Sequence, residues 1–541
     1  MELLSARYVM GRTLDLEGPG AVVHVRADVH ERSNVAALNA LEKRLSELGP
    51  CSRRTYTNHV AFGVRGSADI VEALADAMEA MVLDPAVSAS ELLQTIARAR
   101  RPNWVRLQEL ARGMGLPVLL DDEGLSIGVG AGSATFGMEA RPSDLAGLAT
   151  APVAMVTGTN GKTTTTRFLA AMAQAEGHTV GHTSSDGIFV DEQCLERGDW
   201  SGPGAARRIL RHGRVRFAVL ETARGGMLRR GVQVDFADAA LITNVSADHL
   251  GEWGVETVDD MAEVKLLIGY ALRLGGTLVL NADQWRWPSL LERFQAERPD
   301  VVVRWFSTAR DADACVRDGV VFVHHQPVLP VDDIPLTFGG RAAHNIENAL
   351  AAALAGMAMG LPVYAIAAGL RALTPDPEHS AGRANAFTVA VPGGDATVFV
   401  DFAHNPEGMR HLAVLARTWG EAGHPPARRL LLIGQAGDRS DEVLDATTRA
   451  ALEMEPSHAY LKEMVKYQRG RQPGEVTGRM HAIFAASGVT TSVWADELAA
   501  TDAALGDLRD GDFLLLLAHT DAAAVVERVR ARVTAVLPLP L

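Results

Sequence analysis

The sequence contains little cysteine. Three of its 541 residues are cysteines, Cys51, Cys194 and Cys315, and they are scattered along the chain. Their odd number does not suit a disulfide framework, and their spacing is not that of a metal site. We therefore expect reduced thiols in a cytoplasmic protein.

The sequence also lacks long apolar runs and an excess of positive charge. No window offers the ~18 uninterrupted apolar residues of a membrane span. The first residues, MELLSARYVMGRTLDLEG, carry charges too early and too often for a signal peptide. The formal net charge of −14 argues against a general nucleic-acid or anionic-membrane binder, but it allows local basic pockets for ATP or acidic substrates.

What remains is the composition of an ordinary globular protein. Hydrophobic residues make up 47% of the chain and charged residues 22%, so the chain can build true hydrophobic cores. Its 541 residues predict about three or four domains. We find no internal repeat and no low-complexity tract.

One stretch, APVAMVTGTNGKTTTT at 151–166, has the pattern of a phosphate-binding loop between a strand and a helix. Gly158 and Gly161 allow tight turns that aim backbone N–H groups at phosphate oxygens. Lys162 supplies a mobile positive charge, and Thr163 supplies a hydroxyl for Mg²⁺. The residues expected to bind the nucleotide here are Gly158, Thr159, Asn160, Gly161, Lys162, Thr163 and Thr164.

The loop departs from the usual eight-residue pattern, because Val156 stands where a glycine is expected. We interpret it as a shortened phosphate loop. The alternative is a glycine turn that merely joins a buried strand to a helix.

Strands and helices alternate from Ala151 to about Pro375, which predicts a parallel sheet covered by helices. Ligands of such sheets bind at the carboxyl ends of the strands. The expected strands are Val153–Val156, Phe217–Leu220, Ala240–Asn244 and Thr277–Leu280. Polar clusters follow all four, namely the phosphate loop, 221–226, 244–249 and 281–283, so we expect them to converge on one edge.

The predicted fold class is α/β with three domains. Residues 1–148 form a small N-terminal α/β domain with a linker, and 149–380 form a central P-loop ATPase domain with a mainly parallel sheet. Residues 381–541 form a C-terminal Rossmann-like α/β domain, with strands expected at Thr397–Val400, Leu430–Ile433, Ser492–Trp494 and Phe513–Leu517.

Several motifs in a fixed order resemble the Mur ligase superfamily: GTNGKTTTT, LETARGG, NVSADHL, AEVKLL, LNAD, HNIENALAA and DFAHNP. The spelling is most similar to the C-terminal ligase domain of the cyanophycin synthetases, through TSSDGIFVD, ETARGG and GDRSDE. The resemblance covers about 150–541. Residues before it resemble the same family more weakly, but the ATP-grasp domain that should follow is missing, since Gly137 leads almost directly into the Mur-type domain.

The resemblance implies an ATP-dependent ligase. A carboxylate is phosphorylated by ATP, and an amine attacks the acyl phosphate, giving an amide, ADP and phosphate. Positioning and charge neutralisation dominate such a transfer. Lys162 would hold the phosphates, Thr163 and Glu221 would bind Mg²⁺, and His249 would help to bind a second Mg²⁺.

Lys265 matches a lysine that is often carbamylated in this family, which turns a cation into an oxygen ligand for the metal. The alternative is an unmodified helix lysine in solvent. The alternative for His249 is a loop histidine whose ring is hydrogen-bonded within the protein and binds no metal.

Further residues are assigned through the resemblance alone. Asn345 and Asn348 would meet the adenine, although helix N-capping competes for Asn345. Arg383 would reach the phosphates when the C-terminal domain closes, and Asp401 would hold the ribose or the linker. His404 and Asn405 would shape the closed site. Asp401 and His404 could instead be ordinary polar residues at a strand end.

The substrate side is predicted from two clusters. Thr183, Ser184, Ser185 and Asp186 occupy the position of a motif that faces the carboxylate substrate, and Arg224 with Gly225 could bind its carboxylate. Alternatively, Arg224 only pairs with Asp186. Asp438 and Arg439, with the basic run 462–471, would surround the incoming amine, although that run could be a solvated basic face.

We therefore predict an ATP- and Mg²⁺-dependent carboxylate–amine ligase that acts on an amino acid or peptide and is related to cyanophycin metabolism. The alternatives are a Mur-type ligase of another small-metabolite pathway, or a non-catalytic partner of a full cyanophycin synthetase. Expected partners are amino-acid or peptide substrates, a cyanophycin synthetase or its polymer, and a second copy of the chain. Nucleic acid and membrane are not expected.

Overall fold

The computed structural model describes residues 1–28, 31–121, 124–232, 234–248, 250–375, 377, 382–419 and 426–536. The chain divides into two compact units. The first unit comprises Met1–Val245, Gly251–Phe306 and Ala351–Gly369. The second comprises Ser246–Leu250, Ser307–Leu350 and Leu370–Leu541. Both contain α/β structure, as the sequence predicts, while the predicted boundaries at 148 and 380 stay predictions.

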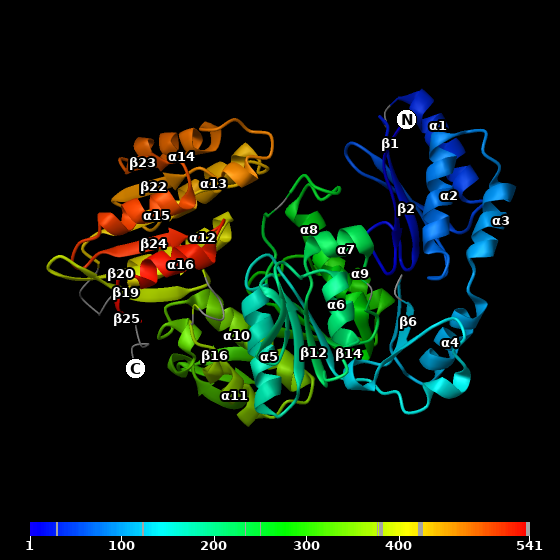
Figure 1. Cartoon of the computed structure of the whole chain (residues 1–541), viewed down its shortest axis with the longest axis horizontal. Coiled ribbons are helices and arrows are strands. Elements are labelled where there is room, and N and C mark those ends of the chain that lie inside the picture. Colours follow the sequence, from blue (N-terminus) through cyan, green and yellow to red (C-terminus); the bar gives the residue numbers. More distant parts are fainter. Residues whose placement is uncertain are drawn as a thin grey trace. The chain divides into compact units, whose positions relative to one another are not determined.

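The first unit begins with a four-stranded antiparallel sheet in the order β1-β2-β4-β3. Its apolar face packs on helices, which Figure 1 shows in blue. β2 and β4 are buried except at their last residues, because valine, alanine and phenylalanine fill them. The elements are β1 (Glu2–Val9), β2 (Gly20–Arg26), α1 (Arg32–Leu45), β3 (Cys51–Thr55), β4 (Val60–Arg65), α2 (Val71–Leu83) and α3 (Ala89–Ala99).

A helix and a small antiparallel sheet connect this part to the main sheet. They are α4 (Pro102–Gly113), β5 (Val118–Asp121), β6 (Gly124–Ile127), β7 (Ala134–Phe136) and the 3₁₀ turns η1 (Gly130–Gly132) and η2 (Pro142–Leu145). The next strand begins at Val153. Only η2 lies between Phe136 and Val153, a segment that the structure describes throughout. The ATP-grasp domain that the resembled family carries at this place is therefore absent from this segment.

The main sheet of the first unit has the order β11-β10-β9-β12-β8-β13-β14-β15. The six neighbouring strands β9, β12, β8, β13, β14 and β15 are parallel, which confirms the prediction of a mainly parallel sheet. The strands are β8 (Val153–Thr157), β9 (Val180–Ser184), β10 (Gly187–Val190), β11 (Gln193–Arg197), β12 (Phe217–Glu221), β13 (Ala237–Ile242), β14 (Leu272–Asn281) and β15 (Val302–Ser307).

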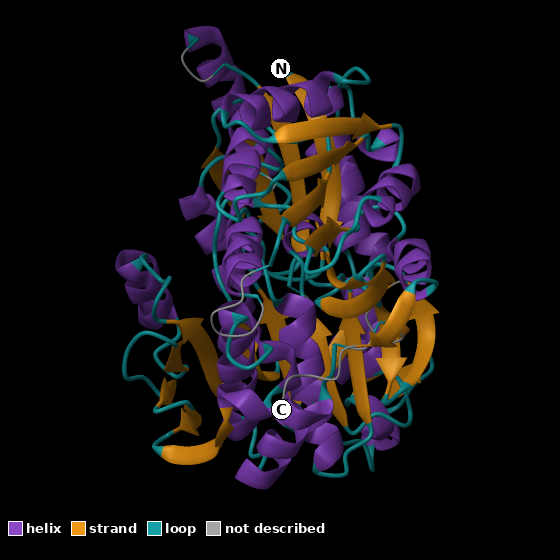
Figure 2. Cartoon of the chain, turned by 90° about the vertical axis from the view of Figure 1, so that its left-hand side faces the viewer, coloured by secondary structure: helices purple, strands orange, loops and turns teal. Residues whose placement is uncertain are grey.

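Helices cover this sheet, and Figure 2 shows strands in orange between helices in purple. All five residues of β8 are buried, which is typical of a central strand covered on both faces. Burying one such aliphatic side chain contributes roughly 1.5–3 kcal/mol. The helices are α5 (Lys162–Ala175), α6 (Pro203–Leu210), α7 (Arg224–Arg230), α8 (Val258–Leu266), η3 (Leu267–Ala271) and α9 (Pro288–Glu297).

Two helices, α10 (Ala343–Ala358) and α11 (Val363–Ala372), contribute residues to both units.

The second unit also contains an antiparallel hairpin pair that the sequence analysis did not predict. Its elements are β16 (Ala314–Arg317), β17 (Val320–Val323), β18 (Gln326–Pro330), η4 (Val331–Asp333) and η5 (Pro335–Thr337).

The C-terminal part of the second unit is a seven-stranded sheet in the order β23-β22-β21-β24-β20-β19-β25. One face of this sheet packs against α12, α13 and α14 through one hydrophobic core, and the opposite face packs against α15 and α16 through another. The strands are β19 (Asn385–Val391), β20 (Gly394–Asp401), β21 (Arg429–Ile433), β22 (His458–Lys462), β23 (Thr490–Trp494), β24 (Phe513–Leu517) and β25 (Val533–Val536). The helices are α12 (Pro406–Thr418), α13 (Asp441–Leu452), η6 (Val465–Tyr467), α14 (Glu475–Ala486), α15 (Glu497–Gly506) and α16 (Ala522–Arg530). None of the described helices is long and apolar enough to cross a membrane.

Candidate functional site

The phosphate loop lies where the sequence predicts it, between β8 and α5. Gly161 adopts a left-handed conformation (φ 81°) directly before the helix. At Gly158, an added Cβ atom would lie 1.8 Å from the Thr243 Oγ1 atom, so only glycine fits beside the neighbouring strand end. The loop therefore needs glycine at both positions, for different physical reasons.

Asn244, just after β13, fastens the loop. Its carbonyl accepts a hydrogen bond from the Thr159 N–H group (3.1 Å). Its side-chain oxygen accepts one from the Asn160 N–H group (2.8 Å), and its side-chain nitrogen donates to the Asn160 carbonyl (3.0 Å). The sequence analysis placed Asn244 in a polar cluster after a strand but did not assign it to the nucleotide site.

Lys162 is the first residue of α5 and folds back over the loop. Its Nζ atom donates hydrogen bonds to the carbonyl oxygens of Gly158 (3.1 Å) and Thr159 (2.9 Å). The ammonium group is thus held at the loop, from which its flexible stem can turn toward an anion. Thr164, also in the first turn of α5, is half-buried.

A group of hard oxygen atoms lies beside the loop. The Thr163 hydroxyl donates a hydrogen bond to the Glu221 Oε2 atom (2.9 Å) and lies 3.1 Å from the Ser185 hydroxyl. The Ser185 N–H group also donates to Glu221 Oε2 (3.3 Å). Thr163 and Glu221 are buried, whereas Ser185 is half-buried. Three residues that the sequence assigns to metal and substrate therefore meet at the ends of β9 and β12.

The remaining residues of the TSSD motif continue this corner. Thr183 and Ser184 are buried in β9, and the Ser184 hydroxyl accepts a hydrogen bond from the Asp186 N–H group (3.1 Å). β10 then returns antiparallel to β9. The motif therefore forms a tight turn next to the oxygen group.

Lys265 lies in α8 and is 2% exposed. This burial corrects the alternative of a solvent-exposed helix lysine, because α8 directs this residue into the protein. His249 lies outside the described residues.

Arg224 begins α7 and pairs with Glu252, with 2.5 Å between the Nη2 and Oε2 atoms. Its side chain is 11% exposed, which leaves little of the guanidinium in contact with solvent. Glu252 was not among the predicted residues, since it lies in an irregular segment with no sequence signal. Gly225 follows in the same helix, and its carbonyl accepts a hydrogen bond from Arg229 Nε (3.1 Å).

In the second unit, Asn345 and Asn348 are buried on α10 and are hydrogen-bonded to one another (3.1 Å). The Asn345 side chain also donates to the Leu336 carbonyl (2.8 Å). The alternative that Asn345 caps the helix is wrong, because α10 begins at Ala343 and Asn345 lies inside its first turn.

Asp401 ends β20 and accepts hydrogen bonds from the N–H groups of Ala384 (3.0 Å) and Ala403 (2.9 Å). Burial raises the pKa of this carboxyl group, against the opposing effect of those bonds and of the Arg383 charge. The Arg383 guanidinium lies over the Phe402 ring, 5.3 Å from its centre. The structure thus places Arg383 and Asp401 near one another at the start of the C-terminal sheet.

His404 and Asn405 follow β20. Asn405 has a structural role, since its side chain caps α12 by accepting a hydrogen bond from the Gly408 N–H group (2.9 Å). His404 Nε2 lies 3.7 Å from the Asp248 carboxylate, which also pairs with Arg439 Nη1 at 3.1 Å. Asp248 was not assigned from the sequence, although it lies in the NVSADHL motif.

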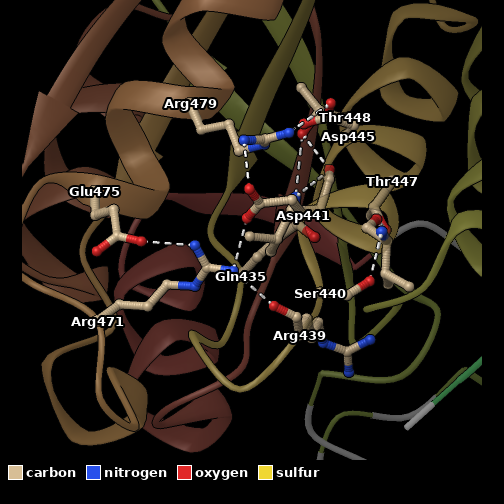
Figure 3. A network of polar contacts seen from close by, with 12 residues as sticks. Gln435, Arg439, Ser440, Asp441, Asp445, Thr447, Thr448, Arg471, Glu475 and Arg479 are labelled. Carbon is tan, nitrogen blue, oxygen red and sulfur yellow. Dashed lines mark hydrogen bonds and ion pairs between the residues drawn. The ribbon is translucent and has the colours of Figure 1, made fainter. Parts of the chain in front are cut away.

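Asp438 forms an ion pair with Arg469. Figure 3 shows a network of polar contacts around Arg471 and Asp441. Arg471 donates to the Arg439 carbonyl (2.9 Å), to Asp441 (2.8 Å) and to Glu475 (2.6 Å). Arg479 joins Asp441 to Asp445. These contacts tie the segment 437–441 to α13 and α14.

Lys462 does not belong to a solvated basic face, whereas Lys466 and Arg469, later in the same run, are exposed. Lys462 ends β22, is 1% exposed, and binds the Glu497 carboxylate and the Leu517 carbonyl. Burial lowers its pKa to about 8, although Glu497 opposes this shift. Glu497 also accepts hydrogen bonds from the N–H groups of His519 and Asp521.

Comparison with known proteins shows which family this part of the chain resembles. Residues 156–356 match the family model of the Mur ligase middle domain. These residues are therefore similar to that domain. Over 397 residues, the chain is 35% identical to the cyanophycin synthetase of Synechocystis sp.. The aligned region covers 70% of this chain and 44% of that protein. The chain therefore spans less than half the length of this curated relative.

Solved structures share the fold of this chain over more residues than the middle-domain match covers. E. coli FolC in complex with DHPP and ADP has a TM-score of 0.52 and 21% identity, covering 70% of this chain and 89% of that one. A bifunctional folylpolyglutamate synthase/dihydrofolate synthase of Yersinia pestis, complexed with AMPPNP and Mn ion, has a TM-score of 0.51 and 19% identity, covering 70% and 89%. Both likenesses confirm the predicted fold class.

Replacing Asn244 by alanine removes the side chain that holds the phosphate loop. Because each lost hydrogen bond to a buried group costs about 1–3 kcal/mol, we expect the affinity for an ATP analogue to fall at least about tenfold. Calorimetric titration would measure it. Asn103→Ala is the matched control, since Asn103 also donates to two backbone carbonyls, in the segment before β8. Equal ATP affinity in both variants would contradict the assigned role of Asn244.

The lowered pKa of Lys462 predicts a pH dependence of stability. Between pH 8 and about 10.5 the unfolded lysine holds a proton that the folded lysine has lost, so the free energy of unfolding rises with pH in this window. Below pH 8 both states are protonated and this contribution is constant. We expect the melting temperature of the wild type to rise relative to that of Lys462→Met across the window. Parallel pH profiles would show that Lys462 keeps an ordinary pKa.

Proposed function

We propose that the protein is an ATP- and Mg²⁺-dependent ligase that joins a carboxylate to an amine through an acyl phosphate. The observation that carries this proposal is the contact of Thr163 and Ser185 with Glu221 at the foot of the phosphate loop. A simple ATP-binding protein has no need of a substrate-side serine at the same carboxylate. The Mur ligase middle domain and the ligase activities named for its relatives support the same reaction class.

The residues fit both ATP and a divalent cation. The loop leads into the N-terminus of α5, where backbone N–H groups and Lys162 suit an anion such as a phosphate. Thr163 and Glu221 offer a hydroxyl and a carboxylate, which are the hard oxygen ligands that Mg²⁺ prefers. When bound, Mg²⁺ would neutralise charge between the phosphates. Related proteins were solved with ADP and with AMPPNP and Mn ion, which supports this cofactor set.

The chain's own residues would then act by positioning. Lys162 would exchange its two carbonyl partners for phosphate oxygens, since both are bound only through its flexible side chain. Arg224 with Gly225, and the Thr183–Asp186 turn, would orient the acid. Asn345, Asn348, Arg383 and Asp401 remain proposals for the nucleotide, and His249 remains a proposal for a second Mg²⁺.

Polar side chains near the end of β22 in the second unit support a place for the amine. Gln435, Lys462, Glu463, Tyr467 and Arg471 line a hollow that has room for about one water molecule, so an amine would bind at its rim. The Glu463 carboxylate accepts hydrogen bonds from the Gly474 N–H group (3.1 Å) and from Thr477, so its position is fixed. A fixed carboxylate attracts an amine in its charged form, while Asp438 and Arg439 lie on the segment that Arg471 holds. We propose an amino acid or peptide as substrate, and a cyanophycin synthetase or its polymer as partner. Self-association and a cytoplasmic location stay predictions from the sequence.

Phosphate release from ATP and Mg²⁺ tests the function. The panel would pair acids with amines and include aspartate, arginine, short Asp–Arg peptides and cyanophycin primers. We expect turnover that needs one acid and one amine together and that is lost in Lys162→Ala, because the loop then lacks its mobile charge. ATP turnover independent of any pair, or no stimulated turnover despite tight ATP binding, would contradict an autonomous ligase and favour the scaffold alternative.

Substitutions of Lys265 test whether turnover needs an oxygen ligand or an ammonium group at this position. We propose that it is carbamylated, which suits a lysine 2% exposed on α8. Lys265→Glu should then retain more turnover than Lys265→Ala, because a carboxylate resembles a carbamate. If Lys265→Arg retains turnover and Lys265→Glu does not, the residue acts as a cation.

A further inference from the structure

We propose that Arg54 and Tyr56, in the N-terminal antiparallel part of the first unit, are positioning residues for the acid-binding side of the ligase site. They bind the helix that carries Lys265 and the loop that holds Arg224. This inference rests on the proposed function. Neither residue was singled out in the sequence, where the N-terminal region shows no catalytic pattern.

Arg54 binds α8. Its Nη2 atom donates to Glu263 Oε2 (2.7 Å), and its Nη1 atom lies 3.4 Å from Glu263 Oε1. The two-point contact fixes direction as well as distance, which a single charge would not do. Glu263 precedes Lys265 by two residues in the same helix, so Arg54 restrains the helix turn that presents Lys265. Both partners are 29% exposed, which limits screening of the pair by solvent.

Tyr56 packs against the loop Gly251–Val255. A Cβ atom at Gly254 would lie 2.4 Å from the Tyr56 ring, so only glycine allows this approach. The loop is closed by a hydrogen bond from the Gly251 N–H group to the Val255 carbonyl (2.8 Å). It therefore behaves as one small body whose position Tyr56 sets.

This loop carries the partner of Arg224. Glu252 lies between the two ends of the loop and pairs with Arg224 at 2.5 Å. A shift of the loop would move Glu252 and so release or reorient the Arg224 guanidinium. Arg7 adds a second link, because it lies over the Trp253 ring (5.1 Å) and donates to the Leu228 carbonyl in α7 (3.3 Å).

A buried carboxylate fixes these N-terminal side chains. The Tyr56 hydroxyl donates to Asp15 Oδ1 (2.5 Å), while Arg7 Nη2 and His24 Nε2 lie 3.6 and 3.3 Å from Asp15 Oδ2. The rings of His24, Tyr56 and His59 form a cluster, with centroid distances of 4.5 Å (Tyr56–His59), 4.9 Å (His24–His59) and 6.1 Å (His24–Tyr56). Such a network costs more to deform than an exposed ion pair, because its buried charges would lose partners.

The experiment compares Arg54→Ala with a charge swap, Arg54→Glu combined with Glu263→Arg. Arg53→Ala is the matched control, since Arg53 is adjacent on β3 but pairs with Glu42 inside the N-terminal sheet and its helices. Two readouts are taken on the full chain. One is the KM for the acid and for ATP in the phosphate-release assay, and the other is hydrogen exchange of residues 250–266.

We expect Arg54→Ala to raise the KM for the acid about tenfold, with the KM for ATP unchanged, and to speed exchange in α8. The charge swap should recover part of both effects, and Arg53→Ala should show neither. Tyr56→Ala should speed exchange at 251–255 in the same way, whereas Tyr56→Phe, which keeps the ring, should do so less.

The proposal is overturned if Arg54→Ala behaves like Arg53→Ala in both readouts, or if the KM values for acid and ATP rise together. Should Arg54→Ala fail to fold, the charge swap decides, because recovery of wild-type exchange in α8 requires the pair itself. If the wild type shows no paired turnover, the proposed function fails and exchange alone decides. Unchanged exchange would then overturn the positioning role, and faster exchange limited to 250–266 would support it.

Discussion

The parallel alignment of β12, β8 and β13 is the constraint on which the rest of the first unit depends. Because their carboxyl ends meet at one edge, residues far apart in the sequence become neighbours. Glu221 reaches Thr163, and Asn244 holds Asn160 from the opposite side. Asn281 extends the edge by donating a hydrogen bond to the Thr243 carbonyl (3.2 Å). The glycine loop is therefore held between two strand ends.

Rigidity of the loop matters for the proposed chemistry. Phosphoryl transfer depends on positioned charges more than on a protein nucleophile. The two glycines allow close approach, and the backbone hydrogen bonds to Asn244 keep that approach from relaxing. Lys162 is the mobile part of this arrangement, because its contacts are made only by the end of its side chain. The site thus combines a fixed anion-binding frame with a movable cation.

Much of this arrangement is predictable from the sequence. The strand–glycine–helix pattern gives the loop, and the rule that ligands bind at strand ends gives Glu221 and the segment from Asn244. β8, β12 and β24 lie within one residue of their predicted bounds, because buried parallel strands are short apolar runs. The strands β16, β17 and β18 were missed, since runs of four or five residues are too short to show a periodicity that distinguishes them from a loop.

Side-chain partners were harder to predict than backbone positions. The residues around Lys462 in the sequence do not distinguish it from an exposed lysine. Its burial follows from the tertiary structure, in which β22 lies between β23 and β21 and Lys462 pairs with Glu497. Asn405 lies within a family motif that predicts a substrate residue, and the sequence did not show that its side chain also caps α12. Glu252, Arg54 and Tyr56 carry no motif at all. The contacts of Arg54 and Tyr56 arise from packing between segments that are about two hundred residues apart, whereas Glu252 pairs with Arg224, 28 residues away.

We assign one divalent cation to the oxygen atoms of Thr163 and Glu221. Diffraction from crystals grown with Mn²⁺ and a non-hydrolysable ATP analogue tests this claim most directly, because the anomalous signal locates the metal independently of the nucleotide. We expect a metal peak coordinated by the Thr163 hydroxyl and the Glu221 carboxylate, with the analogue's phosphates on the loop 158–163. A nucleotide bound elsewhere, or a metal that leaves the Thr163–Glu221 hydrogen bond intact, would contradict this assignment.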